Sequence, residues 1–145
     1  MRRFRVLLAD DDLQMLATTN GLLEPEFDVV HMVSDGSSLI EAALRFAPDL
    51  IVTDISMPKM NGFEAVRQVQ RSLPAIKSVF LTMHGAREYR REARSLGAGY
   101  VLKTSAREEL TRTIRALLQG AAEVPQDQIP RNLPLTNHLV FAINA

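Results

Sequence analysis

Carboxylates and a lysine follow short apolar runs at widely separated places in the chain. Asp10 and Asp11 come directly after Phe4–Ala9, Asp54 follows a second apolar run, and Lys103 follows a third. Runs of this kind are typical of strands buried in a parallel sheet. The carboxyl ends of parallel strands lie at one edge, which is where open α/β sheets bind their ligands. We therefore expect these charged side chains to be neighbours.

Such a cluster favours one kind of chemistry. Packed carboxylates resist ionising together unless a cation joins them, and oxygen ligands without nearby His or Cys favour Mg²⁺ or a similar hard ion. A carboxylate beside Mg²⁺ can attack phosphorus, and the metal and Lys103 would neutralise the charge of the moving phosphoryl group. Thr82, at the end of another predicted strand, would offer a hydroxyl to the phosphate. These residues predict Mg²⁺-dependent phosphoryl transfer to Asp54.

The composition excludes several other classes of protein. The 145 residues, 46% of them hydrophobic, fit one domain with a sizeable core. The 17 basic and 17 acidic side chains balance, which gives no overall attraction to nucleic acid or to an anionic membrane. The absence of cysteine excludes disulfides and thiolate chemistry. No run is long enough to span a bilayer and no signal peptide is present, so we expect a cytoplasmic protein.

The rest of the chain alternates between strand and helix patterns. Strands are predicted over Phe4–Ala9, Phe27–Val33, Leu50–Asp54, Ser78–Thr82 and Gly99–Lys103. Helical spacing of apolar residues follows each strand, over about residues 13–24, 38–47, 61–72, 86–96 and 105–118. Five alternations predict an α/β fold, a doubly wound parallel sheet with right-handed crossovers.

Some side chains are expected to fix the ends and faces of these helices. Asn61 is the expected N-cap of the third helix. Ser105 and Glu108 have the spacing of a capping box at the start of the fifth. In the first helix we expect Leu13, Leu16 and Leu23 near one face.

The sequence resembles the receiver domain of two-component response regulators over about residues 4–120. The features that carry the resemblance are Asp10-Asp11 after a hydrophobic strand, Asp54 with Met57-Pro58 and Gly62 behind it, Thr82 after Val79-Phe80-Leu81, and Tyr100-Val101-Leu102-Lys103. Any one feature is weak, but all four in this order are specific. The stretch Gly99–Ser105 is most similar to the subfamily in which the receiver precedes a helix-turn-helix output domain.

The resemblance implies a flavodoxin-like (βα)5 fold with strand order 2-1-3-4-5. It implies that Asp54 accepts a phosphoryl group from the phosphohistidine of a sensor histidine kinase. Asp11, Asp54 and the backbone carbonyl of Ser56 would bind Mg²⁺ directly, and Asp10 would act largely through water. The chain would be a switch in a phosphorelay that regulates transcription. As an enzyme it would do no more than phosphorylate and dephosphorylate itself.

The resemblance also implies how the switch would work. Lys103 would pair with Asp54 and later with the phosphate, and Thr82 would move toward the phosphate. Tyr100 would then change rotamer as the face made by the fourth helix, fifth strand and fifth helix rearranges. By analogy with the family, a homodimer would form through the same face.

Two features depart from the family pattern. Thr104 follows Lys103 where many members carry proline, which leaves no strong case for a cis peptide bond. No output domain follows the receiver, which we assign to residues 1–121. Residues 122–145 hold three prolines, look like a tail or linker, and are too few for a helix-turn-helix module. We expect no direct nucleic-acid binding by this chain and no membrane partner.

Other functions remain open on the residues alone. A pseudo-receiver that binds partners without phosphorylation is the main alternative, although it would usually have lost an acid or the lysine. A Mg²⁺-dependent phosphatase would be expected to carry a second acid two positions after Asp54, where this chain has Ser56. A nucleotide or flavin binder would need a Gly-rich loop after the first strand, and none is present.

Several of these residues also have plain structural explanations. Asp12 is expected to cap the first helix or face solvent, and Thr82 and Tyr100 suit a strand without any function. His84 would lie at the rim of the site and tune access of water. The fourth helix carries a basic stripe, either a solvated face paired with its own Glu88 and Glu92 or a docking surface; its members are Arg87, Arg90, Arg91 and Arg94.

Overall fold

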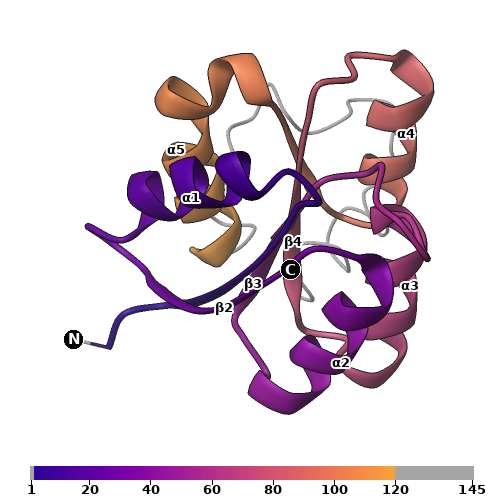
Figure 1. Ribbon diagram of the computed structural model, residues 1–145, viewed down its shortest axis with the longest axis horizontal. Helices are drawn as coiled ribbons and strands as arrows, with labels where there is room; N and C mark the ends of the chain where they lie inside the picture. The colour runs from indigo at the N-terminus through magenta and orange to yellow at the C-terminus, as the bar shows by residue number, and fades with distance from the viewer. Residues whose placement is uncertain (1, 120–145) are drawn as a thin grey trace, which may run out of the picture.

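The computed structural model describes residues 2–119, and strands alternate with helices throughout them (Figure 1). The strands are β1 (Arg5–Ala9), β2 (Asp28–Val33), β3 (Leu50–Thr53), β4 (Lys77–Thr82) and β5 (Gly99–Leu102). The helices are α1 (Leu13–Leu23), α2 (Gly36–Phe46), α3 (Gly62–Ser72), α4 (Arg87–Ser95) and α5 (Ala106–Leu118), with a 3-10 turn, η1 (Lys103–Ser105), before α5. The predicted tail, residues 122–145, lies outside the described residues.

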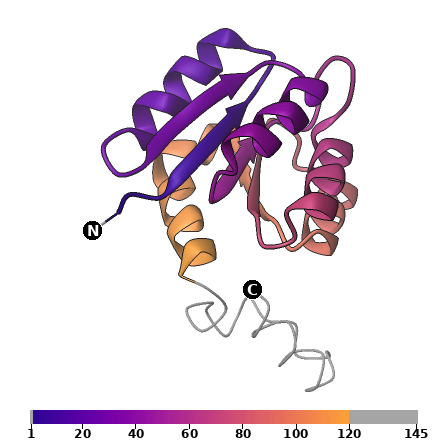
Figure 2. The ribbon, with the colours of Figure 1, turned by 90° about the horizontal axis from the view of Figure 1, so that it is seen from below.

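All strand pairs are parallel, and their order is β2-β1-β3-β4-β5. The predicted flavodoxin-like fold and strand order are therefore confirmed. Helices α1 and α5 cover one face of the sheet, and α2, α3 and α4 cover the other (Figures 1 and 2). No helix among residues 2–119 has the length and apolar character needed to cross a membrane.

The central strands are apolar throughout because both of their faces are buried. In β1, Val6 and Leu8 pack in the core under α1 and α5, whereas Leu7 and Ala9 pack in the core under α2 and α3. All four residues of β3 are buried in the same way. This explains why these strands appear in the sequence as continuous apolar runs rather than as alternating patterns.

The strand register brings the site residues level with one another. Ala9 pairs with Thr53, so Asp10 and Asp54 each follow a paired residue on neighbouring strands. The Asp54 N–H donates to the Ala9 carbonyl at 2.9 Å. Further along the same edge, β4 ends at Thr82, which pairs with the residue before Lys103.

Two local predictions were wrong and two were confirmed. The Asp12 carboxylate caps α1, because it accepts hydrogen bonds from backbone N–H groups of the first turn. Asn61 caps α3, because its side chain accepts a hydrogen bond from the Glu64 N–H. Ser105 makes no side-chain cap, since the 3-10 turn holds it at φ −111° and ψ 9° rather than in the extended conformation of an N-cap. Leu13 is 71% exposed because it is the first residue of α1, ahead of the turn that packs Leu16.

Candidate functional site

Three carboxylates meet at the carboxyl edge of the sheet. One oxygen from each of Asp10, Asp11 and Asp54 lies within 4.8 Å of the other two. The Asp10 and Asp54 residues are buried, at 4% and 8% exposure, while Asp11 is exposed. The cluster therefore has two buried acids and one acid at the solvent, which leaves one open side.

Lys103 lies between the two buried acids. Its Nζ is 2.7 Å from Asp10 Oδ2 and 3.0 Å from Asp54 Oδ2. The predicted neighbourhood of Lys103 and Asp54 is thus present in the structure. The contact with Asp10 is the shorter of the two, and it agrees with the expectation that the charged residues at the strand ends are neighbours.

The site holds more negative than positive charge. Burial lowers the pKa of Lys103, but its hydrogen bonds to Asp10 and Asp54 and the negative charges of these acids together outweigh burial and raise the pKa above its ordinary value. Burial raises the pKa of Asp10, and the opposing hydrogen bonds from Lys103 and the Asp12 N–H do not cancel this effect. One ammonium thus faces three carboxylates.

The donor set fits a hard divalent cation. Every side-chain ligand in the cluster is a carboxylate oxygen, and no His or Cys belongs to it. Mg²⁺ prefers such oxygens and keeps several waters, so it suits a site with one open side. A divalent charge here would also remove the repulsion among the acids.

The residues on either side of Asp54 in the chain hold it in place. Its Oδ1 accepts a hydrogen bond from the Ile55 N–H at 2.7 Å, and its carbonyl accepts one from Thr53 Oγ1 at 2.8 Å. A Cβ on Gly62 would lie 2.1 Å from the same carbonyl, so only glycine fits there. Ser56, the predicted carbonyl ligand, lies exposed two residues further along the loop.

A second group of contacts connects Thr82 with Tyr100 through His84. The buried Thr82 Oγ1 accepts a hydrogen bond from the His84 N–H at 3.2 Å. The Tyr100 hydroxyl donates to the His84 carbonyl, and burial raises the pKa of that hydroxyl. The Arg90 guanidinium lies over the Tyr100 ring, 4.6 Å from its centroid. This connection was missed because it runs through backbone groups, which carry no sequence signal.

The basic stripe on α4 does not have the partners that we expected. Glu92 pairs with Arg67 of α3 at 2.6 Å rather than with an arginine of its own helix. Within the described part of the chain, no carboxylate lies within 4.0 Å of the guanidinium groups of Arg87, Arg91 and Arg94. The predicted pairing of Glu92 was therefore wrong.

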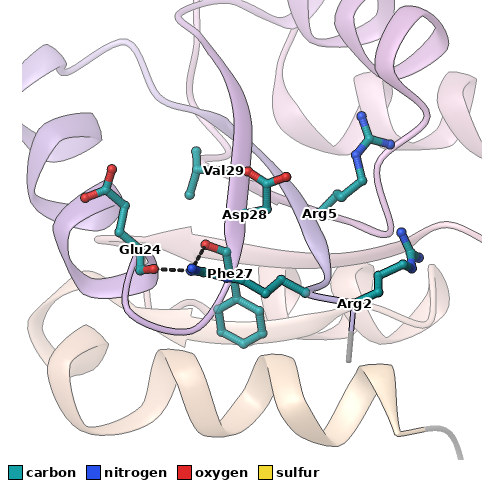
Figure 3. Close-up of a pocket in the computed structure, with 7 residues that line it drawn as sticks. Arg2, Arg5, Glu24, Phe27, Asp28 and Val29 are labelled. Carbon is teal, nitrogen blue, oxygen red and sulfur yellow. Dashed lines mark hydrogen bonds between the residues drawn. The ribbon is translucent and has the colours of Figure 1, made fainter.

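A cavity of about 640 Å³ lies at the opposite edge of the sheet, by the amino ends of β1 and β2 (Figure 3). Among the described residues, three arginines line it: Arg2 pairs with the Asp49 carboxylate, and the other two bond mainly to carbonyls at the ends of helices. Arg3 donates to the carbonyl of Glu24, which caps the end of α1, and to that of Phe27 just before β2, and Arg5 donates to the carbonyls of Phe46 and Ala47 at the end of α2. Such contacts satisfy the last carbonyls of a helix, so we assign these arginines a structural role.

The fold and the site together define a class: a doubly wound α/β domain with a lysine-paired acidic cluster at its carboxyl edge. Residues 6–115 match the family model described as the response regulator receiver domain. The chain belongs to that family.

Related proteins agree with this assignment. The chain is 36% identical over 103 residues to the transcriptional regulatory protein DegU of Brevibacillus brevis, covering 70% of this chain and 44% of DegU. It is 35% identical over 119 residues to the transcriptional regulatory protein LiaR of Bacillus subtilis, covering 80% and 56%. The chain thus spans about half the length of these relatives. A crystal structure of a LuxR-family two-component response regulator from Aurantimonas sp. SI85-9A1 superposes with a TM-score of 0.77 at 30% identity, covering 81% and 86%.

Proposed function

We propose that this chain is a phospho-acceptor switch in which Asp54 takes a phosphoryl group from a histidine kinase with the help of Mg²⁺. The observation that carries the proposal is the placement of Asp54 against Lys103, beside Asp10 and Asp11. That arrangement provides a nucleophile, a cation site and a fixed positive charge within one small volume. The presence of all four groups also speaks against the alternative, a pseudo-receiver that acts without phosphorylation.

In this proposal Asp11, Asp54 and the Ser56 carbonyl hold Mg²⁺, and Asp10 acts mainly through water. The bound ion would supply charge neutralisation for the phosphoryl oxygens. An Asp54 oxygen forms a bond to phosphorus as the bond from phosphorus to the donor's imidazole nitrogen breaks. Lys103 then moves its hydrogen bond from the carboxylate to a phosphate oxygen.

The switching step would use the contacts around His84. A phosphate on Asp54 attracts the Thr82 hydroxyl, which now accepts from the His84 N–H. Movement of Thr82 therefore shifts His84, whose carbonyl holds Tyr100. Because Arg90 lies on the Tyr100 ring, the change reaches the face made by α4, β5 and α5. A homodimer through this face, and transcription as the regulated process, belong to the same proposal by analogy with the relatives.

Phosphoramidate, whose phosphorus–nitrogen bond resembles that of phosphohistidine, tests the proposal. We expect the intact mass of the wild-type protein to gain one phosphoryl group with Mg²⁺ and none with a chelator. The Asp54→Asn variant should stay unlabelled at the same Mg²⁺ concentration. Equal labelling with and without Mg²⁺ would refute the role of the metal. Absence of labelling in folded, Mg²⁺-loaded wild type would favour the pseudo-receiver.

Lys103→Ala separates phosphorylation from switching. The variant keeps the nucleophile and the acids, so it should still be labelled, though slowly. It loses the ammonium that would hydrogen-bond the phosphate, so the NMR signals of the Tyr100 ring should no longer change when the protein is phosphorylated. A wild-type Tyr100 response in the labelled variant would refute the relay.

A further inference from the structure

The loop that follows Asp54 is closed on itself. The Gly62 N–H donates to the Ile55 carbonyl at 2.7 Å, which joins the two ends of residues 55–62. Ser56, the candidate carbonyl ligand, belongs to this loop. The position of the loop therefore decides where a backbone oxygen lies relative to the Asp54 carboxylate.

The middle of the loop contains a tight and unfavourable turn. The Met60 N–H donates to the Pro58 carbonyl at 2.7 Å, and Lys59 between them has a φ of 69°. A γ-turn is a three-residue turn closed by a hydrogen bond between its first and third residues. The form whose central residue has a positive φ is the rare one. A lysine in this conformation is strained, so surrounding contacts must hold it.

Those contacts come from the start of α2. The Gly36 N–H donates to the Pro58 carbonyl at 3.4 Å, and the Asp35 carboxylate is 3.7 Å from the Lys59 ammonium. A Cβ on Gly36 would lie 2.1 Å from the Met60 carbonyl oxygen and 2.6 Å from its Cβ, closer than atoms can approach. Gly36 has no positive φ. It is therefore needed for close approach and not for its backbone conformation.

We propose that Gly36 is a positioning residue for the cation site. The missing Cβ lets the turn at Pro58–Met60 pack against the start of α2. This contact fixes the Ser56 carbonyl beside Asp54. The inference rests on the proposed function, which places Mg²⁺ at this site. A purely structural role for Gly36 would change the stability of the fold without changing the affinity of folded molecules for Mg²⁺.

Gly36→Ala tests this role, and Gly21→Ala is a matched control. Both replace a glycine in a helix, but a Cβ on Gly21 meets nothing within 4 Å. We expect the Mg²⁺ dissociation constant of folded, unphosphorylated Gly36→Ala, measured by NMR titration, to rise about tenfold, as for groups that orient metal ligands. Gly21→Ala should bind Mg²⁺ like the wild type. The labelling rate of Gly36→Ala should recover when Mg²⁺ is raised to saturation.

Pro58→Ala decides the question if Gly36→Ala does not fold. Pro58 is exposed, and its replacement frees the turn without adding atoms, so the fold should be kept while Mg²⁺ binding weakens. Wild-type Mg²⁺ affinity in folded Gly36→Ala, or in Pro58→Ala if that is the only folded variant, would overturn the positioning role and leave the proposed function intact. If the wild type itself binds no Mg²⁺, the proposed function and the positioning role both fall.

Discussion

Asp10 is an acid of the site whose burial is not fully compensated. It is buried, it accepts hydrogen bonds from Lys103 and from the Asp12 N–H, and its pKa is nevertheless raised, chiefly by burial. A raised pKa means that the folded state holds the Asp10 proton more tightly than the unfolded chain does. In the metal-free protein, ionised Asp10 therefore lowers stability.

We predict that Asp10→Asn raises the stability of the metal-free protein at pH 7. The gain should be about 1 kcal/mol, the usual size of a single substitution effect. Below pH 3.8, the ordinary pKa of the group, Asp10 is protonated in both states and the gain should vanish. It should grow as the pH rises from there through the folded-state pKa, because the folded state binds more protons in that window. Urea unfolding of the wild type and of Asp10→Asn from pH 3 to 8, with a chelator present, measures the difference in their free energies of unfolding.

Adding Mg²⁺ supplies the control for that experiment. The ion should stabilise the wild type more than Asp10→Asn, since the variant lacks one of the charges that attract it. A variant that is less stable than the wild type at pH 7 without metal would contradict the account of Asp10.

At the scale of single residues, the charged groups that form the site could be predicted better than the residues that hold them in position. Asp10, Asp54 and Lys103 were placed together correctly because parallel topology brings strand ends to one edge. The need for glycine at position 36 could not be predicted, since it comes from close contact with the Met60 carbonyl of a distant loop. His84 was predicted at the rim, but its link from Thr82 to Tyr100 uses backbone atoms that any residue would supply.

Helix α4 depends on α3 for part of its anchorage. It has nine residues and buries only one of them, Ala93. Arg67 of α3 reaches Glu92 at 2.6 Å, and Gln70 of α3 donates to the Leu96 carbonyl at 2.9 Å. A short helix with so little buried surface opens readily, which suits an element on a switching face.

We predict that Arg67→Gln loosens α4 more than the rest of the fold. The pair with Glu92 is partly exposed, so its loss should cost about 0.5 kcal/mol. Amide exchange in α4 should therefore rise about twofold, while exchange in the central strands stays unchanged. Arg71→Gln is the matched control, because Arg71 lies exposed on the same helix and has no carboxylate within 4.0 Å in the described residues. Equal effects of the two substitutions would contradict the proposed anchorage.

At the scale of elements, the alternation of strands and helices was fully predictable, and so was the Asn61 cap of α3, but the starts of α1 and α5 were not. Periodicity identified α1, but it could not show that Leu13 precedes the first packed turn. The Ser105–Glu108 spacing suggested a cap, but the 3-10 turn after β5 takes its place. Both errors arise because tertiary packing decides where a helix starts. The pairing of Glu92 with Arg67 of α3 was missed for the same reason, since it depends on how two helices pack.

For the whole molecule, the described residues form one sheet with one core cluster under α1 and α5 and two core clusters on the opposite face. We predict that residues 1–121 fold as an independent domain. This fragment should unfold in one cooperative transition at the midpoint of the full chain, and it should be phosphorylated at the same rate. Thermal melting and intact-mass labelling of the two proteins side by side test this. A lower midpoint or slower labelling of the fragment would contradict the assigned domain boundary.

Locating the phosphoryl group tests the central claim most directly. Borohydride reduces an acyl phosphate to an alcohol, so a phosphorylated aspartate becomes homoserine, which peptide mass spectrometry can place in the sequence. After incubation with Mg²⁺ and acetyl phosphate, we predict homoserine at position 54 and at no other acid. Conversion at Asp10 or Asp11 instead, or continued conversion in Asp54→Asn, would contradict the account of this site.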